Sequence, residues 1–337
     1  MKAALFKAPG DIELVERNLD TPQGNELIIK VDSCGVCGTD FHIYHGTAPA
    51  KNNTVLGHEF SGVIVDKGKD CHDFTVGDKV VIDPNIYCGK CSYCKEGKVQ
   101  FCENHKAIGV TQDGGFAEYV LTPCTQAYKI PSNFPLNLAA FAEPLSCCIR
   151  GIDRAEIKVG ESITIIGGGA IGLMMMQLAK ISGAAKVIII EPDKNRRELA
   201  IQLGTDFVFS PIDENLFQSI MDITNGGADT VIECVGKPVA IENGIGLTKR
   251  GGKIVIFGLA PIKSKIELNL NEIFRKELSI KNSFLNPFTF GRAIDLLFSR
   301  KINVDLFTVK KVNIDELRNV FLLDNNLNSL KYQFHNN

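Results

Sequence analysis

The sequence predicts a protein of two parts, a small β-rich domain followed by an α/β domain built on a parallel sheet. In the first part, short apolar runs are separated by turns that contain Gly, Pro or Asp, which is typical of a barrel-like β domain. From about residue 153, apolar strands alternate with helical segments, and this pattern indicates a parallel sheet covered by helices on both faces. A chain of 337 residues is long enough for two cores of ordinary size.

The β-rich part is predicted over residues 1–152. Strands are expected at 27–31, 60–65 and 114–121, and residues 76–82 are expected to form a turn that enters another strand. A cysteine-dense lobe occupies residues 88–102. A helix is predicted over 138–151, with Pro144 bending or restarting it because proline has no backbone N–H to donate.

The α/β part is predicted over residues 153–288. Its expected strands are 162–166, 186–190, 207–209, 230–234 and 253–257, and its expected helices include 173–180 and 194–203. The last segment, 289–337, has a helix at 293–298 but no core of its own. It is therefore expected to dock on one of the other two parts.

Composition and charge exclude several classes of protein. Hydrophobic residues make up 45% of the chain and charged residues 23%, and the formal net charge is −2 without a block of five like charges. We therefore expect neither nucleic acid nor a membrane surface as a partner. The first ten residues hold an apolar run too short for a signal peptide, and no run approaches the ~18 residues of a membrane span. A cytoplasmic protein is predicted.

The cysteines indicate metal binding. Their number, eleven, is odd, which argues against a closed disulfide framework. Four of them follow the pattern C-x2-C-x2-C-x7-C, and two residues between thiolates let a tight turn present both sulfurs to one tetrahedral ion. These four are Cys88, Cys91, Cys94 and Cys102. Four thiolates saturate zinc, so a structural zinc is predicted; ordinary loop cysteines and a redox or iron–sulfur site are the alternatives.

A second zinc site is predicted from Cys37, His58 and Glu59. Each residue alone is a weak signal, because a lone cysteine is usually a small buried hydrophobe and Gly-His-Glu can be a turn. Glu143 strengthens it: the carboxylate opens a Glu-Pro-Leu inside an apolar helix, where it would be costly without a cation nearby. Contact with that cation can be direct or through water. Three protein ligands are typical of a catalytic zinc that keeps one position open.

Zinc of this kind lowers the pKa of an alcohol, and the resulting alkoxide is a better hydride donor than the alcohol. Thr39, two residues after Cys37, is predicted to relay the departing proton, and His42 to carry it towards solvent. The plainer alternatives are a turn-stabilising hydroxyl for Thr39 and a surface residue for His42. Asp40 is expected to hold the loop through hydrogen bonds.

The stretch from Gly167 to Gly172 matches the dinucleotide pattern G-x-G-x-x-G. It follows a buried strand and opens a helix, which is the context that gives the pattern meaning. The glycines let the backbone approach a pyrophosphate at the positive end of the helix. The predicted cofactor-binding residues of this turn are Gly167, Gly169, Ala170, Ile171 and Gly172.

Glu191 lies at the end of the next predicted strand, where a carboxylate accepts hydrogen bonds from the adenosine ribose. Its charge would repel a 2′-phosphate, so NAD is predicted as the cofactor in preference to NADP. The nearby Arg196 and Arg197 are evidence for NADP instead, because arginine can bind a 2′-phosphate. We interpret both as helix-surface residues that lie over the adenine, and Arg196 is a predicted cofactor-binding residue.

Taken together, these motifs resemble the zinc-dependent medium-chain alcohol dehydrogenases. Cys-Gly-Thr-Asp, Gly-His-Glu, the four-cysteine lobe, Glu-Pro-Leu and the glycine pattern occur in that family's order, over nearly the whole chain. The Gly-His-Glu and Glu-Pro-Leu motifs resemble the polyol, sorbitol, butanediol and threonine dehydrogenase branch. The resemblance implies a GroES-like β-barrel catalytic domain, a Rossmann coenzyme domain inserted before the last segment, a cleft between them, and a dimer or tetramer. It also implies two zinc ions per chain.

Three departures from the branch bear on the substrate pocket. Arg150 stands where a histidine often follows the Glu-Pro-Leu helix, and Leu285 where sorbitol dehydrogenases tend to carry a substrate-facing arginine. The loop 47–54 is short and lacks the usual proline before Gly-His-Glu. Sorbitol itself is therefore not the expected substrate.

The sequence thus predicts a zinc- and NAD-dependent oxidoreductase that interconverts a secondary alcohol and its ketone. The expected substrate is a polyol, a sugar alcohol or a small diol. L-threonine and a sugar-alcohol phosphate are the alternative substrates. A non-catalytic module that responds to zinc or nucleotide is the alternative outside enzymology, and the presence of Thr39 with an open zinc site argues against it.

Overall fold

The computed structural model describes residues 1–307, 309–323 and 329–336, and the chain divides into two compact units. The first unit comprises Met1–Pro144, Phe290–Ser299 and Phe307–Asn337. The second unit comprises Leu145–Thr289 and Arg300–Leu306. Most of the last segment thus belongs to the first unit, as expected of a segment without its own core.

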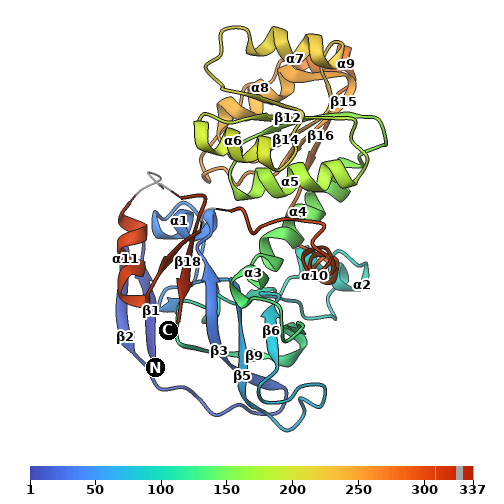
Figure 1. The fold of residues 1–337 in the computed structure, drawn as a ribbon. Coiled ribbons are helices and arrows are strands. Elements are labelled where there is room, and N and C mark those ends of the chain that lie inside the picture. Colours follow the sequence, from blue (N-terminus) through green and yellow to red (C-terminus); the bar gives the residue numbers. More distant parts are fainter. Residues whose placement is uncertain (308, 324–328, 337) are drawn as a thin grey trace. The chain divides into compact units, whose positions relative to one another are not determined.

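The main sheet of the first unit is built around one long strand, β3 (Glu26–Gly35), which pairs antiparallel with β5, β9 and β18 (Figure 1). The strand order is β10-β6-β5-β3-β18-β17, with β9 paired to β3 as well. The other strands are β5 (Glu59–Lys67), β6 (Lys79–Ile82), β9 (Tyr119–Pro123), β10 (Ala127–Lys129), β17 (Val309–Val312) and β18 (Lys331–His335).

Smaller elements close this unit around an apolar core. Phe6, Phe60, Phe116, Phe321 and Phe334 are all buried in the core. The smaller sheets join β2, β1 and β4, and β7 with β8. The elements are β1 (Lys2–Ala8), β2 (Asp11–Glu16), α1 (Gly38–Tyr44), β4 (Thr54–Val55), β7 (Asn85–Ile86), α2 (Ser92–Lys95), η1 (Val99–Phe101), β8 (Lys106–Ala107), η2 (Cys124–Gln126), α3 (Leu136–Ala139), α10 (Phe290–Phe298) and α11 (Ile314–Leu322).

The second unit is a six-stranded parallel sheet in the order β13-β12-β11-β14-β15-β16, with helices on both faces (Figure 1). The strands are β11 (Ser162–Ile166), β12 (Lys186–Ile190), β13 (Phe207–Phe209), β14 (Ala228–Glu233), β15 (Thr248–Ile256) and β16 (Ser279–Asn282). The helices are α5 (Ala170–Ile181), α6 (Lys194–Gln202), α7 (Leu216–Thr224), α8 (Pro238–Leu247) and α9 (Leu270–Lys276), and α4 (Ala142–Ala155) leads into the unit. The central strands β11 and β12 are almost wholly buried, which explains their continuous apolar sequences.

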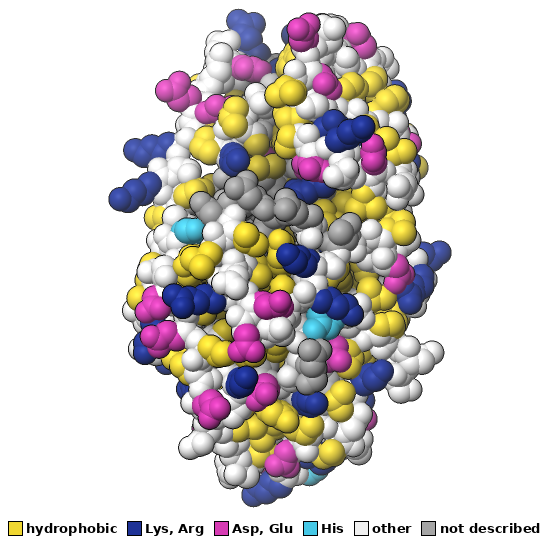
Figure 2. Space-filling view, turned by 60° about the vertical axis from the view of Figure 1, so that its left-hand side comes forward, with side chains coloured by type: hydrophobic (Ala, Val, Ile, Leu, Met, Phe, Trp, Pro, Cys, Tyr) yellow, Lys and Arg dark blue, Asp and Glu magenta, His cyan; other side chains and the backbone are white. Residues whose placement is uncertain are grey.

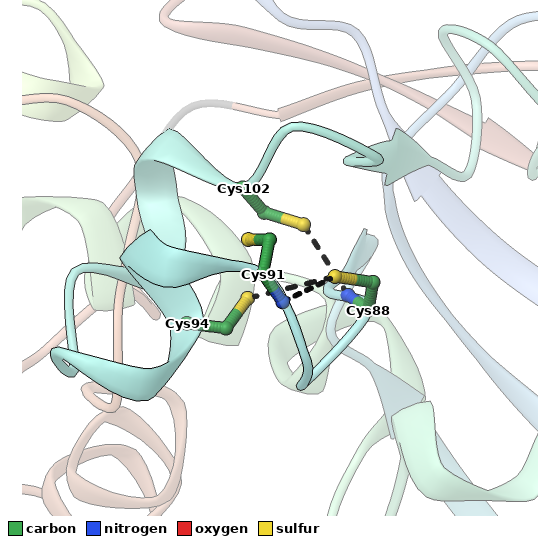
Figure 3. A group of neighbouring side chains, drawn as sticks. All are labelled: Cys88, Cys91, Cys94 and Cys102. Atoms are coloured by element: carbon green, nitrogen blue, oxygen red, sulfur yellow. Dashed lines mark hydrogen bonds between the residues drawn. The ribbon is translucent and has the colours of Figure 1, made fainter.

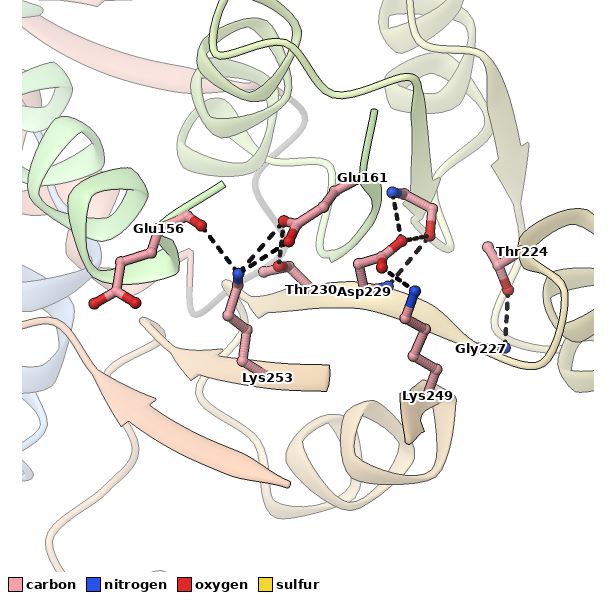
Figure 4. A network of polar contacts seen from close by, with 9 residues as sticks. Glu156, Glu161, Thr224, Gly227, Asp229, Thr230, Lys249 and Lys253 are labelled. Atoms are coloured by element: carbon pink, nitrogen blue, oxygen red, sulfur yellow. Dashed lines mark hydrogen bonds and ion pairs between the residues drawn. The ribbon is translucent and has the colours of Figure 1, made fainter. Parts of the chain in front are cut away.

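A polar network joins the amino-terminal ends of β11, β14 and β15 (Figure 4). Asp229 accepts hydrogen bonds from the backbone N–H and the hydroxyl of Ser162, at 2.8 and 2.7 Å, and pairs with Lys249. Lys253 lies 3.3 Å from Glu161. These contacts stabilise the amino-terminal end of the sheet. In such sheets ligands usually bind at the opposite end, beyond the carboxyl ends of the strands.

The predicted elements differ from the structure in two instructive places. The strand expected over 114–121 begins only at Tyr119, because residues Gly114 and Gly115 donate backbone hydrogen bonds to Val55 and Gly57 outside the sheet. The helix expected over 138–151 is two helices, α3 and α4, and Pro144 lies in the first turn of the second, where a missing N–H is tolerated.

The surface is mixed in character. Figure 2 shows lysine, arginine, aspartate and glutamate side chains interspersed on one face of the molecule. No helix in the described part of the chain is long and apolar enough to cross a membrane.

Candidate active site

The four cysteines of the lobe 88–102 converge on one point (Figure 3). The sulfur atoms of Cys88, Cys91, Cys94 and Cys102 lie within 4.8 Å of one another. Cys91 is the residue before α2, and η1 leads into Cys102, so two short turns bring the sulfurs together. Backbone N–H groups of Lys90 and Cys91 lower the pKa of the Cys88 thiol to about 6, whereas desolvation and the neighbouring thiols raise the pKa of Cys94 to about 12. A closed tetrathiolate of this kind suits a structural zinc.

Cys37 lies at the start of the short helix α1, immediately before Gly38. The carboxylate of Asp40 is fully buried and accepts a 2.8 Å hydrogen bond from the backbone N–H of Cys37. Asp40 therefore holds the loop, as the sequence predicted.

His58 immediately precedes β5, and Glu59 is the first residue of that strand. Gly57 has φ +92° and no space for a side chain, since a Cβ there would lie 2.8 Å from both Cys34 and Phe116. The next two side chains are consequently buried, with exposed fractions of 7% for His58 and 1% for Glu59. His58 Nδ1 lies 3.4 Å from Asp40 Oδ1, so one ring nitrogen faces a carboxylate, the arrangement that orients a metal-binding imidazole.

Cys37, His58 and Glu59 form the second group of metal-ligand atoms within 4.8 Å. Burial alone would lower the pKa of His58, but the charge and hydrogen bond of Asp40 and the contact with Cys37 raise it well above its usual value. Both carboxylate oxygens of Glu59 are buried without a hydrogen-bond partner among the described residues, and one of them, Oε2, forms an ion pair with Lys331. Buried carboxylate oxygens beside a thiol and an imidazole fit a metal cation.

Glu143 is in the first turn of α4 and is 8% exposed. It is not among the atoms that lie within 4.8 Å of one another in the Cys37 group. Burial raises the pKa of Glu143 to about 7, and the charges of His58 and Glu59 act on it. Glu143 is thus close enough to interact electrostatically with His58 and Glu59. Its contact with zinc, direct or through water, remains a prediction.

The glycine-rich turn of the second unit has the geometry of a phosphate-binding loop. It follows β11, and Gly167 has φ +102°, a conformation that favours glycine. A Cβ on Gly172 would lie 1.8 Å from the carbonyl oxygen of Gly167, so the first turn of α5 packs directly against the loop. Gly169 precedes the helix, which begins at Ala170 and Ile171. The free N–H groups of this helix end can receive a pyrophosphate.

Glu191 follows β12 and is 3% exposed. Its carboxylate accepts hydrogen bonds from the backbone N–H groups of Gly168, at 2.6 Å, and Asp193, at 3.0 Å. Arg196 reaches the same turn, since its Nη1 lies 4.0 Å from the position of a Cβ on Gly169. Arg197 instead donates to the carbonyl oxygens of Glu191 and Pro192, at 2.7 Å each. Its side chain thus stabilises the backbone that follows β12.

Comparison with known proteins agrees with this architecture. Residues 23–132 match the family model of the alcohol dehydrogenase GroES-like domain, and residues 170–299 match that of the zinc-binding dehydrogenases. The L-threonine 3-dehydrogenase of Pyrococcus furiosus is 36% identical over 322 residues, which cover 92% of this chain and 91% of that protein. The chain belongs to the zinc-dependent medium-chain alcohol dehydrogenases.

Two further members illustrate the range of this alcohol dehydrogenase family. The D-arabitol-phosphate dehydrogenase of Enterococcus avium is 34% identical over 331 residues, which cover 95% of this chain and 93% of that protein. The crystal structure of a zinc-binding dehydrogenase from Sinorhizobium meliloti 1021, bound to NADP, is 37% identical with a TM-score of 0.96, and covers 99% of both chains. The expected GroES-like and Rossmann domains are confirmed, and the chain is an oxidoreductase that acts on alcohols with zinc and a nicotinamide cofactor.

In this dehydrogenase, Thr39 and His42 are three residues apart on α1, so they lie on the same side of the helix. Thr39 is half-buried, two residues after Cys37. His42 Nδ1 lies 2.9 Å from the hydroxyl of Thr47. Burial and the neighbouring His45 lower the pKa of His42. The geometry is compatible with the predicted relay.

Lys331, on β18, is a site residue that sequence reasoning missed. It forms an ion pair with Glu59, and its side chain is 10% exposed. The sequence around it, Leu-Lys-Tyr-Gln-Phe, offers only a weak strand pattern near the polar end of the chain. The only available signal was an isolated lysine in a short alternating run.

Proposed function

We propose that this dehydrogenase oxidises the secondary alcohol of a small polyol, sugar alcohol or diol with NAD, and catalyses the reverse reduction. The observation that carries the proposal is the three-ligand group of Cys37, His58 and Glu59, whose atoms lie within 4.8 Å. Three protein ligands leave one zinc position for substrate, whereas the four-cysteine lobe is saturated. The names of the Pyrococcus and Enterococcus relatives, which describe threonine and arabitol phosphate, favour small hydroxylated substrates.

Each proposed site residue has a distinct role in the reaction. Cys37, His58 and Glu59 hold the metal, with Glu143 beside them, and bound zinc supplies the Lewis acidity that makes a substrate hydroxyl acidic. Thr39 accepts the hydroxyl proton and passes it to His42, which is partly exposed. A nicotinamide bound at the glycine-rich turn would supply the hydride acceptor.

The substrate class is tested by following NAD reduction with a panel of polyols, diols, L-threonine and sugar-alcohol phosphates. The proposal predicts the highest kcat/KM for an unphosphorylated polyol or diol. L-threonine is the second candidate because of the Pyrococcus relative, and a clear preference for it would replace the polyol assignment. A preference for a phosphorylated substrate would also replace the polyol assignment.

NAD is proposed as the cofactor because of Glu191, although the Sinorhizobium protein was crystallised with NADP. The buried carboxylate already accepts two backbone hydrogen bonds, so it is fixed and its charge faces the turn. A 2′-phosphate beside it would be repelled, while ribose hydroxyls can donate to it. Arg196 near the turn would contact the pyrophosphate or the adenosine.

Glu191→Ser is expected to raise the KM for NAD about 10- to 100-fold, since hydrogen bonds to a charged group are worth about 1.5–3 kcal/mol. The KM for NADP should fall, because the repulsive charge is gone. The ratio of kcat/KM for the two cofactors measures the change. Glu198→Ser on α6, where Glu198 pairs only with the exposed Lys194 among the described ion pairs, is the matched control. An unchanged ratio in Glu191→Ser would show that this carboxylate does not select the cofactor.

Two zinc ions per chain are expected when the protein is purified without chelators. Cys94→Ser should lose one of them, because the lobe then has three thiolates, and Cys124→Ser, outside both metal groups, should keep two. Elemental analysis by mass spectrometry gives the ratio. One zinc or none in the unaltered protein would contradict the two-site assignment.

We also propose a homo-oligomer, either a dimer or a tetramer. Large apolar side chains are exposed in the segment 259–288, with exposed fractions of 72% for Ile262, 75% for Leu270 and 84% for Phe274. Strand β16 is an edge of its sheet, and both features favour contact with a second chain. A light-scattering mass of a single 36.9 kDa chain would refute the proposal.

Two further assignments complete the proposal. The predicted domain boundaries, 1–152, 153–288 and 289–337, are supported by compact units that divide the chain nearby, at 144/145 and 289/290. A cytoplasmic location is supported by the cluster of four candidate metal-binding cysteines, because thiols stay reduced in that compartment.

A further inference from the structure

Lys331 and Glu59 meet across strand β3. On one side, Gly35 of β3 is paired with Glu59 of β5, and on the other side with Gln333 of β18. Lys331 begins β18, so its ammonium reaches over β3 to the carboxylate of Glu59. The last strand of the first unit thus supplies a charge to the proposed zinc site.

Gly35 makes this contact possible. A Cβ at this position would lie 2.2 Å from Glu59 Oε2 and 2.9 Å from Lys331 Cε. Any other residue would have to displace the ion pair. The absence of a side chain on β3 therefore forms the space in which the two charged groups meet.

The ammonium of Lys331 is paired with the carboxylate of Glu59, and the lysine side chain is 10% exposed. It offsets one of the negative charges that surround the proposed metal.

The pair also distinguishes the two oxygens of Glu59. Both oxygens are buried without a hydrogen-bond partner among the described residues, and Oε2 is the one that forms the ion pair with Lys331. A carboxylate can bind a metal through one or both oxygens. With Oε2 engaged, only Oε1 is available to a cation.

We propose that Lys331 is a positioning residue that makes Glu59 a one-oxygen ligand, so that a zinc position stays open for the substrate. The inference rests on the proposed zinc site of Cys37, His58 and Glu59. Without Lys331, the buried carboxylate would turn both oxygens to the metal. The second oxygen would then compete with the substrate hydroxyl.

Cobalt(II) tests this proposal, because the visible absorption of the ion weakens when its coordination number rises from four to five. Each protein is loaded with cobalt at both sites, and the spectrum of the same protein carrying Cys37→Ser is subtracted to remove the four-cysteine lobe. Lys331→Met is expected to keep its cobalt but to show the weaker five-coordinate difference spectrum. Its kcat/KM should fall about 10- to 100-fold, the usual effect of losing a group that orients a metal ligand.

Two variants serve as controls. Lys331→Arg retains the cation and should restore the four-coordinate spectrum, and Lys311→Met removes an exposed lysine from the neighbouring strand β17 and should match the unaltered protein. Gly35→Ala should reproduce the spectrum of Lys331→Met, because its Cβ displaces the pair while Lys331 remains. Agreement between Gly35→Ala and Lys331→Met would exclude a simple loss of lysine packing.

The outcomes separate this inference from the function on which it rests. If the unaltered protein shows no Cys37-dependent cobalt spectrum, the zinc site itself is wrong. If that spectrum is present and Lys331→Met leaves it unchanged, the positioning role is refuted while the zinc site stands. Loss of the Cys37-dependent cobalt from Lys331→Met would also refute it, because Lys331 would then retain the metal rather than set its ligand number.

Discussion

Cys37→Ser is expected to abolish turnover while NAD binding stays within about twofold of the unaltered protein. A serine hydroxyl is not ionised at neutral pH and is a poor zinc ligand, so the proposed site would lose its metal or its geometry. Lewis-acid activation is worth several kcal/mol, and kcat should therefore fall at least about 10³-fold. Steady-state kinetics and calorimetric titration with NAD measure the two quantities.

Loss of the fold would not explain such a result. Cys37 precedes helix α1, and serine is a preferred residue at that position, so the helix should persist. The glycine-rich turn belongs to the other compact unit and is not altered. Cys124→Ser provides the control for a cysteine outside both metal groups and should retain full activity. Full turnover by Cys37→Ser would remove the basis of the zinc mechanism.

The two groups of candidate metal ligands were predictable from the sequence because their spacing is local. Cys88, Cys91 and Cys94 are separated by two residues each, and short turns place their sulfurs together whatever the rest of the chain does. The pair His58 and Glu59 is adjacent in the sequence, and the same glycine turn buries both. The glycine pattern after β11 is likewise a local signal, and Gly167 has the positive φ that it implies.

Long-range contacts could not be predicted in this way. Lys331 contacts Glu59 only because β18 pairs with β3, and strand order depends on packing over the whole sheet. The same holds for β17 and β18 themselves, which are short and lie in a segment without a core of its own. Glu191 was predicted as a cofactor residue, but its hydrogen bond to Gly168 required the fold, since it joins two different strand ends.

The second large effect is expected at Gly172. A Cβ there would lie 1.8 Å from the carbonyl oxygen of Gly167, and because this oxygen is a backbone atom and the Cβ is fixed to the backbone, only a backbone shift can relieve the clash. Gly172→Ala should therefore push the start of α5 away from the turn that follows β11. A displacement of about 1 Å at a binding site weakens function roughly 100-fold, so the Kd for NAD should rise at least that much. The strain should also lower the free energy of unfolding by about 1–3 kcal/mol.

Gly246→Ala separates this clash from the general effect of replacing a helical glycine. Gly246 lies in α8 of the same unit, and a Cβ there would make an ordinary 3.5 Å contact with Phe217. Alanine should stabilise that helix by about 0.5–1 kcal/mol, and NAD binding should not change. Chemical unfolding of the two variants should therefore give stability changes of opposite sign. Titration with NAD should show weaker binding only for Gly172→Ala. Equal behaviour of the two variants would mean that the close approach of Gly172 to Gly167 does not shape the cofactor site.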